Sequence, residues 1–414
     1  MLKIPVIGYR ITLSDMVSGL LYFLSGNSRE RFGATLSSFI PSGRIYLVNS
    51  GTAAFYTILQ SLKTKSLKRE VIIPAHAARC LVVAIRKAGL KPVLCDISGK
   101  EFNMTANTVR EAVTSDTLCV VCVHMFGMPV GDIAKIKDDL PEDVFLVEDC
   151  AQAMGVKVDG RLTGSFADAA IFSFNRGKHL PTYGGGALIV NSDRLRDDIE
   201  KTLGGFKDAG FIQECSLFVK FIVLAMLFRP LFYTIACPFM GPSKNQTYPD
   251  DFPVFKYTPV QAGLGASLLK RFNQSVLDRH YSAATIMNTL RDDRGIVLPE
   301  IRETMEPSFN RLPIMVKDMD RKKRIEAALK QAGIQSASMD VNPLHHVYDL
   351  GYEKDAFPNA VHLADHLIAL PVHSMLSGKD IRRLIGLVTS TKQIKGTEHA
   401  NPVEKFQKIS GQDI

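Results

Sequence analysis

FSFNRGK at residues 172–178 and VEDCAQ at residues 147–152 are the two stretches that decide the predicted fold. Each begins with apolar residues typical of a short buried strand and ends in polar side chains. Lys178 follows one of these strands and Asp149 ends the other. Either residue alone is ordinary, because lysines near strand ends are usually solvated and aspartates there usually cap helices.

Lys178 and Asp149 together supply the minimum that pyridoxal 5′-phosphate (PLP) chemistry requires. A lysine amine can bond to the aldehyde of this cofactor. A carboxylate can keep the pyridine nitrogen protonated, so that the ring withdraws electrons. We therefore predict that both residues are catalytic and that the cofactor is PLP.

The region around these residues alternates between strand-like and helix-like segments. Strands are predicted at residues 45–49, 71–74, 92–95, 118–124, 144–148, 169–174 and 187–191. Strands that alternate with helices indicate an α/β fold with a mostly parallel sheet between helices. Ligands of such folds collect at the carboxyl ends of the strands, which is where Asp149 and Lys178 fall.

The length of 414 residues is too great for one compact core, so more than one domain is expected. We predict a large PLP-binding domain over residues 1–245, which includes an apolar segment at 216–240. A smaller α+β domain follows over residues 246–391, and residues 392–414 form a flexible tail. The smaller domain is expected to contain a long amphipathic helix from about 259 to 290, a strand at 312–316, and helices at 321–333 and 379–389.

Composition restricts the function further. The chain is 46% hydrophobic, which excludes a largely disordered protein, and its seven scattered cysteines suit reduced thiols in the cytoplasm.

The CxxC string at residues 119–122 lies in a predicted strand whose side chains alternate between faces, so no metal site is expected there. The basic run at residues 321–324 is interpreted as a solvated helix face, and no nucleic-acid partner is predicted. No signal peptide is recognisable at the N-terminus.

The apolar segment at residues 216–240 is unusual. Its longest unbroken apolar run covers residues 221–228, well short of the roughly 20 residues that a membrane-spanning helix needs. One interpretation is a buried or dimer-covered helical hairpin. Another is peripheral insertion into the inner face of the membrane, with Lys220 and Arg229 reaching toward headgroups. A transmembrane span ranks third.

Several further residues are candidates for binding the cofactor. Gly51 and Thr52 follow a strand and begin a helix, where exposed amides suit a phosphate, although such a pair is also an ordinary helix start. Ser173 can donate a hydroxyl to the same phosphate, or serve only as a strand residue. Gln152, three residues after Asp149, can reach the phenolic oxygen of the ring, or simply begin a helix.

The motifs that contain these residues resemble those of the DegT/DnrJ-type sugar aminotransferases, a branch of the fold-type I PLP enzymes. The resemblance runs from about residue 45 to residue 390, and its order and spacing carry it more than any single motif. The matching strings include NSGTAAF at 49–55, EVIIPAH at 70–76, VEDCAQAMG at 147–155, GSFADAAIFSFNRGK at 164–178 and LADHLIALPVHSMLS at 363–377.

The resemblance implies a role for each candidate residue. Lys178 would be the cofactor lysine and proton shuttle, Asp149 would pair with the pyridine nitrogen, and Gln152 would lie beside the ring. The cofactor phosphate would be bound by Gly51, Thr52 and Ser173. The implied reaction moves an amino group from glutamate to a nucleotide-linked keto sugar, for polysaccharide, lipopolysaccharide or glycoside biosynthesis, in a homodimer.

The chain departs from the family pattern at several positions. Ala78 stands where many relatives place an aromatic residue over the cofactor ring, and His76 is a candidate to replace it. Val254 occupies a position where relatives often carry an asparagine that reaches the partner's phosphate, and Lys256 a frequent arginine position. The glycine loop at residues 183–186 lacks the usual acidic residue. These differences affect the expected substrate more than cofactor binding.

Two other functions are compatible with this sequence. One is a PLP-dependent sugar dehydratase of the same fold, in which relatives replace the lysine by histidine. The lysine register at Lys178, with His179 only its neighbour, favours the transaminase. The other is a non-catalytic, membrane-associated regulator that retained the fold, which the altered pocket and the apolar segment suggest.

Overall fold

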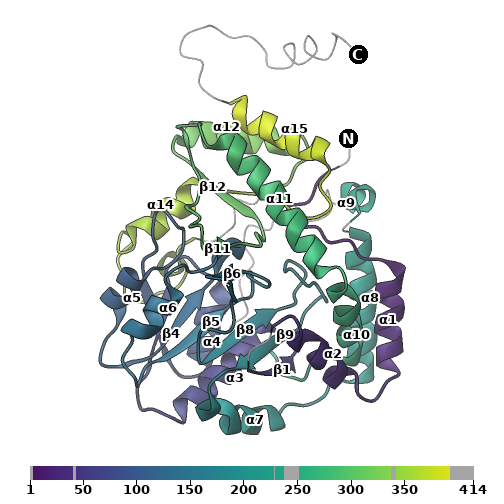
Figure 1. The fold of residues 1–414 in the computed structure, drawn as a ribbon, viewed down its shortest axis with the longest axis vertical. Helices are drawn as coiled ribbons and strands as arrows, with labels where there is room; N and C mark the ends of the chain where they lie inside the picture. Colours follow the sequence, from purple (N-terminus) through teal and green to yellow (C-terminus); the bar gives the residue numbers. More distant parts are fainter. Residues whose placement is uncertain (1–2, 41–42, 228, 237–250, 337–341, 392–414) are drawn as a thin grey trace.

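The computed structural model describes residues 3–40, 43–227, 229–236, 251–336 and 342–391. The predicted tail at 392–414 and the end of the apolar segment, residues 237–240, lie outside the described residues. Figure 1 shows a large body built around one sheet, with a smaller group of strands and helices above it.

The large sheet has the strand order β1-β9-β8-β5-β4-β2-β3. Every neighbouring pair is parallel except those of β9, which runs antiparallel to both β1 and β8. This confirms the predicted mostly parallel sheet, and each predicted strand agrees with the structure within one residue at either end. The strands are β1 (Arg44–Val48), β2 (Glu70–Pro74), β3 (Lys91–Cys95), β4 (Thr117–Val123), β5 (Phe145–Asp149), β8 (Ala169–Ser173) and β9 (Gly186–Val190).

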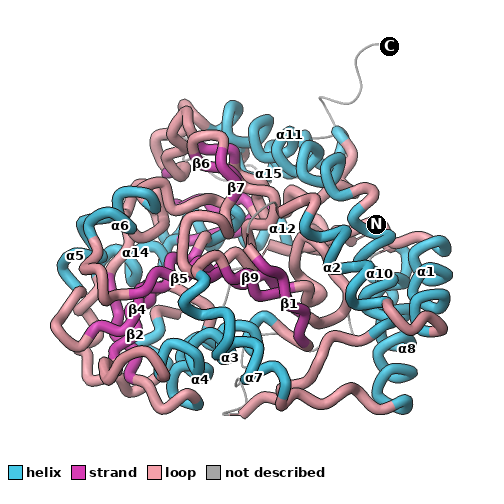
Figure 2. The backbone as a smooth tube through the Cα atoms, turned by 60° about the horizontal axis from the view of Figure 1, so that its bottom comes forward, coloured by secondary structure: helices cyan, strands magenta, loops and turns pink. Residues whose placement is uncertain are grey.

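Helices cover both faces of this sheet (Figure 2). Alternate residues of β5 point to opposite faces, as in any strand. Val147 therefore belongs to the core under α3 (Gly51–Lys63) and α4 (Arg79–Lys87). Leu146 belongs to the separate core under α5 (Ala106–Ala112) and α6 (Ile133–Asp139). The near-continuous apolar sequence of these strands follows from burial on both sides.

The predicted long helix over residues 259–290 is wrong, because the structure contains two helices. α10 (Pro259–Leu269) packs on α1 (Leu13–Phe23) and α2 (Ser28–Ser37), with residues 260–269 all buried. α11 (Phe272–Leu290) is buried along only part of its surface. The chain turns between them, where the Arg271 side chain donates to the Arg10 carbonyl oxygen at 3.2 Å and to the Asp15 carboxylate at 2.7 Å.

A smaller group of strands and helices is formed by residues from the C-terminal part of the chain. An antiparallel sheet of order β10-β12-β13 contains β10 (Ile296–Val297), β12 (Leu312–Val316) and β13 (Leu367–Leu370). α12 (Met319–Gln331) and α15 (Gly378–Thr389) pack against each other, close to the helix positions predicted. The predicted domain boundary at residue 245 falls outside the described residues and stays a prediction.

Shorter elements complete the described part of the chain. The small sheet of order β11-β6-β7 was not predicted from the sequence. The N-terminal helices α1 and α2, which precede the region of the resemblance, were not predicted either. The remaining elements are β6 (Lys157–Val158), β7 (Arg161–Leu162), β11 (Met305–Glu306), α7 (Arg196–Gly204), α13 (Leu344–Val347), α14 (Pro358–His366) and the short helices Met125–Gly127 and Asp193–Leu195.

The apolar segment contributes to two helices, α8 (Phe211–Leu227) and α9 (Pro230–Ala236). They stand beside α1 and α10 at one side of the molecule (Figure 1). No helix in the described residues combines the length and hydropathy needed to cross a bilayer.

Glu148 holds the carboxyl end of β5 in place. Its carboxylate is fully buried and accepts hydrogen bonds from the backbone N–H groups of Gly164, Phe166 and Ala167, at 2.7, 2.8 and 3.0 Å. The His124 Nε2 lies 3.2 Å from the same carboxylate. Because the Val130 N–H donates to Nδ1 of His124, the ring proton is on Nε2 and is donated to Glu148. The loop before β8 is thereby fastened to the end of β5.

We expect Glu148→Ala to lower the free energy of unfolding by about 3 kcal/mol, because three buried N–H groups lose their acceptor. Chemical denaturation of the purified protein, followed by circular dichroism, measures the change. The matched control is Glu142→Ala, which removes an exposed glutamate six positions earlier and should change the free energy by less than about 0.5 kcal/mol. Equal stabilities of the two variants would contradict this role for Glu148.

Candidate active site

The predicted site residues come together at the carboxyl edge of the large sheet. Asp149 is the last residue of β5, Lys178 lies five residues after the end of β8, and Gly51 begins α3 shortly after β1. Since β1, β5 and β8 point the same way, their carboxyl ends meet at one edge. The topology therefore juxtaposes three segments that are far apart in sequence.

Gly51 lies directly against Ser173. A Cβ atom at Gly51 would lie 3.0 Å from Ser173 Cβ and 3.4 Å from its Oγ, so only glycine leaves this approach unstrained. The Ser50 hydroxyl caps α3 by accepting from the Ala53 N–H at 3.0 Å. The remaining N–H groups of the first turn, together with the positive end of the helix dipole, suit an anion such as a phosphate.

Lys178 and Asp149 are electrostatically coupled. Burial lowers the pKa of the Lys178 amine, the nearby Asp149 carboxylate and Cys80 thiol raise it, and the charge of Arg311 lowers it. Burial raises the pKa of Asp149, which is only 5% exposed, while a hydrogen bond from the Ala151 N–H and the charges of Lys178 and His124 lower it. A partly buried amine therefore lies within electrostatic reach of a buried carboxylate.

Cys80 is a site residue that the sequence did not reveal. It lies in the first turn of α4 and is partly exposed. Burial and the charge of Asp149 raise the pKa of its thiol, whereas a hydrogen bond from Thr52 and the charge of Lys178 lower it. Cys80 therefore accepts a hydrogen bond from Thr52 and lies within electrostatic reach of both Lys178 and Asp149. Nothing in its sequence context distinguishes it from the cysteines of the strands.

Gln152 and His76 take different positions around this cluster. The Gln152 amide lies 3.6 Å from the Met125 sulfur and remains partly exposed just beyond Asp149. His76 is fully buried and packs at 5.9 Å from the Phe126 ring. Ala78, by contrast, is partly exposed as the N-cap of α4. Whether His76 replaces the family's aromatic residue stays a prediction.

Two arginines lie near the segment of Lys178 and His179, and sequence patterns did not identify them: the charge of Arg311 acts on Lys178 and that of Arg279 on His179. Arg311 directly precedes β12, and its charge reaches Lys178. Arg279 on α11 is 1% exposed and donates to the carbonyl oxygens of Asn310 and Gly8, at 3.3 and 3.4 Å. Burial lowers the pKa of each guanidinium to about 10. Their contacts come from distant segments, so no local motif marks them.

His179, the neighbour of Lys178, points away from this cluster. It is 2% exposed, and its Nε2 lies 2.9 Å from the Ser308 hydroxyl. Burial, together with the charge of Arg279, holds its pKa well below the usual value. The lysine, and not the histidine, is therefore the side chain presented to Asp149.

His124, Glu148 and Cys150 are the only group within the described residues whose ligand atoms are arranged closely enough for a metal ion. All three are buried, and the Glu148 carboxylate is already engaged by three backbone donors and by His124. This bonding explains the arrangement as a structural network. Cys119 and Cys122 of the CxxC string are both buried free cysteines.

The arrangement fits PLP. A glycine that keeps a helix start open beside a serine hydroxyl suits the phosphate, and a buried carboxylate suits a protonated ring nitrogen. An amine whose pKa is lowered by burial is more readily available in its neutral, nucleophilic form. The residues present therefore match the three parts of the cofactor: phosphate, ring and aldehyde.

The model of the DegT/DnrJ/EryC1/StrS aminotransferase family matches residues 14–218 and 240–389. The chain belongs to this family. Membership confirms the predicted resemblance and the predicted transaminase class. The matched segments include every predicted site residue and leave out residues 219–239, which contain most of α8 and all of α9.

Curated relatives are similar to this chain over different lengths. A dTDP-3-amino-3,4,6-trideoxy-α-D-glucose transaminase from Micromonospora megalomicea is 36% identical over 41% of this chain and 45% of its own length. A GDP-perosamine synthase from Vibrio cholerae is 29% identical over 45% of this chain and 50% of its own.

Solved structures are similar over nearly the whole chain. PseC of Helicobacter pylori, an aminotransferase involved in the biosynthesis of pseudoaminic acid, has a TM-score of 0.76 with 20% identity, over 94% of this chain and 99% of its own. Spr1654 of Streptococcus pneumoniae, a putative sugar aminotransferase in its PLP form, has a TM-score of 0.74 with 22% identity, over 94% of this chain and 98% of its own. These similarities confirm the fold-type I architecture.

We expect Gly51→Ala to weaken PLP binding about tenfold, because the added methyl group crowds Ser173 at the start of α3. Titration of the apo-protein with PLP, followed by visible absorbance, gives the dissociation constant. Gly204→Ala at the end of α7 is the matched control, since no atom lies within 4 Å of a Cβ built there. Unchanged affinity in Gly51→Ala would rule out this phosphate position.

The pH dependence of the reaction between apo-protein and PLP tests the charges around Lys178. Arg311→Gln removes a positive charge that lowers the pKa of Lys178, so the profile should move to higher pH. Asp149→Asn removes a negative charge that raises this pKa, so the profile should move to lower pH. The rate of absorbance change at saturating PLP measures both shifts.

Arg176→Gln is the control for these two variants, because Arg176 is exposed and close in sequence but does not shift the pKa of Lys178. Its profile should match that of the unmodified protein. Shifts of the same sign in Arg311→Gln and Asp149→Asn would contradict the assigned electrostatics.

Proposed function

We propose that this protein is a PLP-dependent aminotransferase that transfers an amino group from glutamate to a nucleotide-linked keto sugar. The observation that carries the proposal is the coupling of Lys178 with Asp149 beside the Gly51–Ser173 contact. This arrangement, in a chain that belongs to an aminotransferase family, supports amino transfer over other uses of the fold. The product would serve polysaccharide, lipopolysaccharide or glycoside biosynthesis.

The cofactor would be held by residues from separate segments. Gly51, Thr52 and Ser173 would bind the phosphate, and Asp149 would hold the ring nitrogen. Gln152 would lie beside the ring, and His76 is the proposed replacement for the missing aromatic residue. When bound, PLP supplies an electron-withdrawing ring that stabilises negative charge on the carbon losing its proton.

Lys178 would move protons between the reacting carbons. The amine must be neutral to accept a proton, and burial together with the charge of Arg311 favours that form. The Asp149 carboxylate acts in the opposite direction and raises this pKa. The balance of the two charges sets the pH at which the amine becomes basic.

The cationic surroundings of Lys178 support an acidic amino donor. Arg311 lies near enough to alter the pKa of Lys178, and the buried Arg279 is bonded only to backbone carbonyl oxygens among its described contacts. A carboxylate that entered this region would find compensating positive charge in a weakly solvated setting, where such attraction is strong. Glutamate carries two carboxylates and fits this requirement.

The keto-sugar acceptor is supported by relatives rather than by local geometry. A dTDP-sugar transaminase and a GDP-perosamine synthase are among the similar curated proteins. The altered positions Ala78 and Val254 lie in the segments that would shape the acceptor pocket in the family. We propose a cytoplasmic homodimer, in which the partner subunit completes each site, and retain residues 1–245 and 246–391 as its proposed domains.

The dehydratase and regulator alternatives have less support. A dehydratase would carry histidine in the lysine register, whereas here Lys178 is presented to Asp149 and His179 is buried against Ser308. A non-catalytic regulator would have no need for a buried carboxylate coupled to an amine. Burial penalises both charges, so the pair lowers the stability of the fold, and a catalytic function is a reason to retain it.

The decisive experiment uses the purified protein reconstituted with PLP. A visible absorbance band should form and disappear on addition of glutamate. Subsequent addition of keto sugars linked to dTDP, GDP or UDP should restore the band with at least one of them, and mass spectrometry should detect the amino sugar. Lys178→Ala should form no such band, whereas Lys201→Ala, which removes an exposed lysine on α7, should behave like the unmodified protein.

Each outcome has a separate meaning. If no band forms and Lys178→Ala is indistinguishable from the unmodified protein, the enzymatic proposal is wrong. If another amino acid and not glutamate removes the band, only the donor is wrong. A restored band without an amino sugar would exclude the acceptor class.

A further inference from the structure

α1 presents an apolar stripe to solvent. Leu13, Val17, Leu20, Leu21 and Leu24 recur at helical spacing, and their exposures range from 47% at Val17 to 75% at Leu24. The opposite side of the same helix packs on α10. Within the described part of the chain, no other element covers the exposed stripe.

α8 presents a second exposed apolar stripe. Ile212, Val219, Val223 and Met226 are 43–84% exposed, while Phe221, Leu224 and Ala225 on another face are buried. α9 continues the surface with Leu231, Phe232 and Ile235. A helix that is apolar on two faces, with one of them facing water, is unusual in a soluble monomer.

The two stripes form one surface, here called the apolar ridge. α1 and α8 lie side by side in Figures 1 and 2, and they run in opposite directions. Phe23 at the end of α1 and Phe211 at the start of α8 have ring centroids 5.9 Å apart. At the other end, Leu13 shares a groove of about 770 Å³ with Ala225 and Leu231.

Positive charge surrounds the apolar ridge. Lys220 on α8 and Arg229 between α8 and α9 are exposed, as is Arg10 just before α1. The two acids in α1, α8 and α9 are Asp15 and Glu214, and both are buried. The rim of the apolar ridge is therefore cationic.

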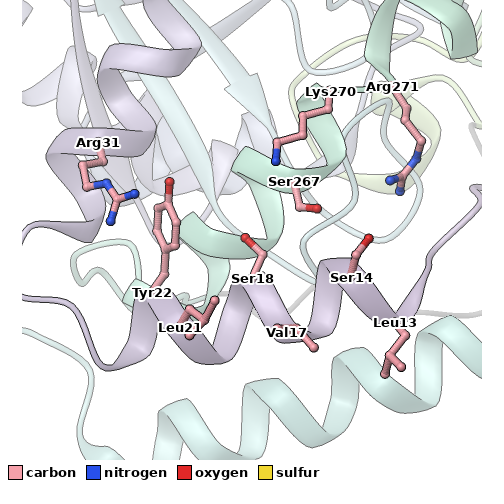
Figure 3. Close-up of a pocket in the computed structure, with 10 residues that line it drawn as sticks. All are labelled: Leu13, Ser14, Val17, Ser18, Leu21, Tyr22, Arg31, Ser267, Lys270 and Arg271. Carbon is pink, nitrogen blue, oxygen red and sulfur yellow. The ribbon is translucent and has the colours of Figure 1, made fainter.

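Two grooves flank α1, and each combines apolar walls with cations. One groove, of about 690 Å³, lies between α1 and α10 and contains Leu13, Val17 and Leu21 together with Arg31, Lys270 and Arg271. Figure 3 shows the three cations on one side of α1. The other groove contains Arg10 and Arg229 beside Leu231 and Phe232. Apolar walls next to cations match an acyl chain next to a phosphate.

We propose that the apolar ridge binds the surface of a membrane that contains anionic phospholipids. α8, at 17 residues, lies in the interface with Ile212, Val219, Val223 and Met226 among the acyl chains, while Lys220 and Arg229 contact phosphates. The family match omits residues 219–239, which carry the second half of the α8 stripe and all of α9, whereas the α1 stripe from residue 14 onward and Ile212 lie inside the match.

Charge favours lipid over a second copy of the chain as the occupant. A two-fold contact between two ridges would bring cationic rims of the same sign together, which is unfavourable. An anionic lipid surface neutralises the same cations and receives the apolar side chains at once. The inference does not depend on the identity of the sugar substrate.

Vesicle flotation with the full-length protein tests the proposal. The protein should float with vesicles of equal parts phosphatidylcholine and phosphatidylglycerol, and much less with phosphatidylcholine alone. Val219→Glu/Val223→Glu should abolish flotation, because two charges would enter the acyl region. Lys220→Gln/Arg229→Gln should weaken binding to the anionic vesicles at least about tenfold. Leu277→Glu is the matched control, an exposed leucine of α11 outside the ridge.

A fluorescence measurement keeps the test independent of disruptive variants. The chain contains no tryptophan, so Val223→Trp introduces a single reporter at a position that is 49% exposed. Its emission should shift to shorter wavelength with anionic vesicles and be quenched by brominated acyl chains. Leu277→Trp should show neither change.

Several outcomes would overturn the proposal. Failure of the unmodified protein to float with anionic vesicles would do so, as would an unshifted Val223→Trp emission. If Val219→Glu/Val223→Glu leaves flotation unchanged but converts a dimer to a monomer in sedimentation, the ridge is a subunit contact instead. Equal binding to neutral and anionic vesicles would remove the role of the cationic rim.

Discussion

The alternation of side chains along β5 is the constraint on which the site depends. Glu148 points to one face of the sheet, where its buried carboxylate fastens the loop before β8 through three backbone N–H groups. Asp149, the next residue, must then point to the other face, where α3 and α4 begin. One residue thus fixes the strand end, and its neighbour brings a carboxylate within reach of Lys178. A shift of register by one residue would exchange these two roles.

Sequence patterns were informative wherever the chemistry and the fold are local. The strands of the large sheet are nearly continuous apolar runs bounded by turns, so their limits could be predicted within one residue. Asp149 and Ser173 end strands, and Gly51 and Lys178 follow strands within a few residues, so the rule that ligands collect at the carboxyl edge of parallel strands predicted that they would lie together. The predicted long helix failed at Lys270 and Arg271 because the break depends on a tertiary contact with Asp15, which no local pattern reveals.

The residues that the sequence did not identify share one property: their positions depend on packing between distant segments. Arg279 is held by carbonyl oxygens from residues 8 and 310, and Arg311 acts on Lys178 across the sheet edge. Cys80 reaches the site only because α4 starts beside α3. Arg311 and Cys80 act on the pKa of the Lys178 amine, and Arg279 acts on that of His179. The sequence therefore indicates which chemistry is present but not how the pKa of the amine is controlled.

The apolar ridge and the site make different demands on the same fold. The site needs buried, fixed side chains at the sheet edge, which the family fold supplies through residues inside the matched segments. The ridge needs exposed apolar side chains. Those of α1 from residue 14 onward and of the first half of α8 lie inside that match, and those of residues 219–239 lie outside it. Because α10 packs against both α1 and α8, the helices of the ridge rest on α10 without entering the sheet. A surface function could therefore be added without altering the geometry around Lys178, which separates where the protein acts from what reaction it performs.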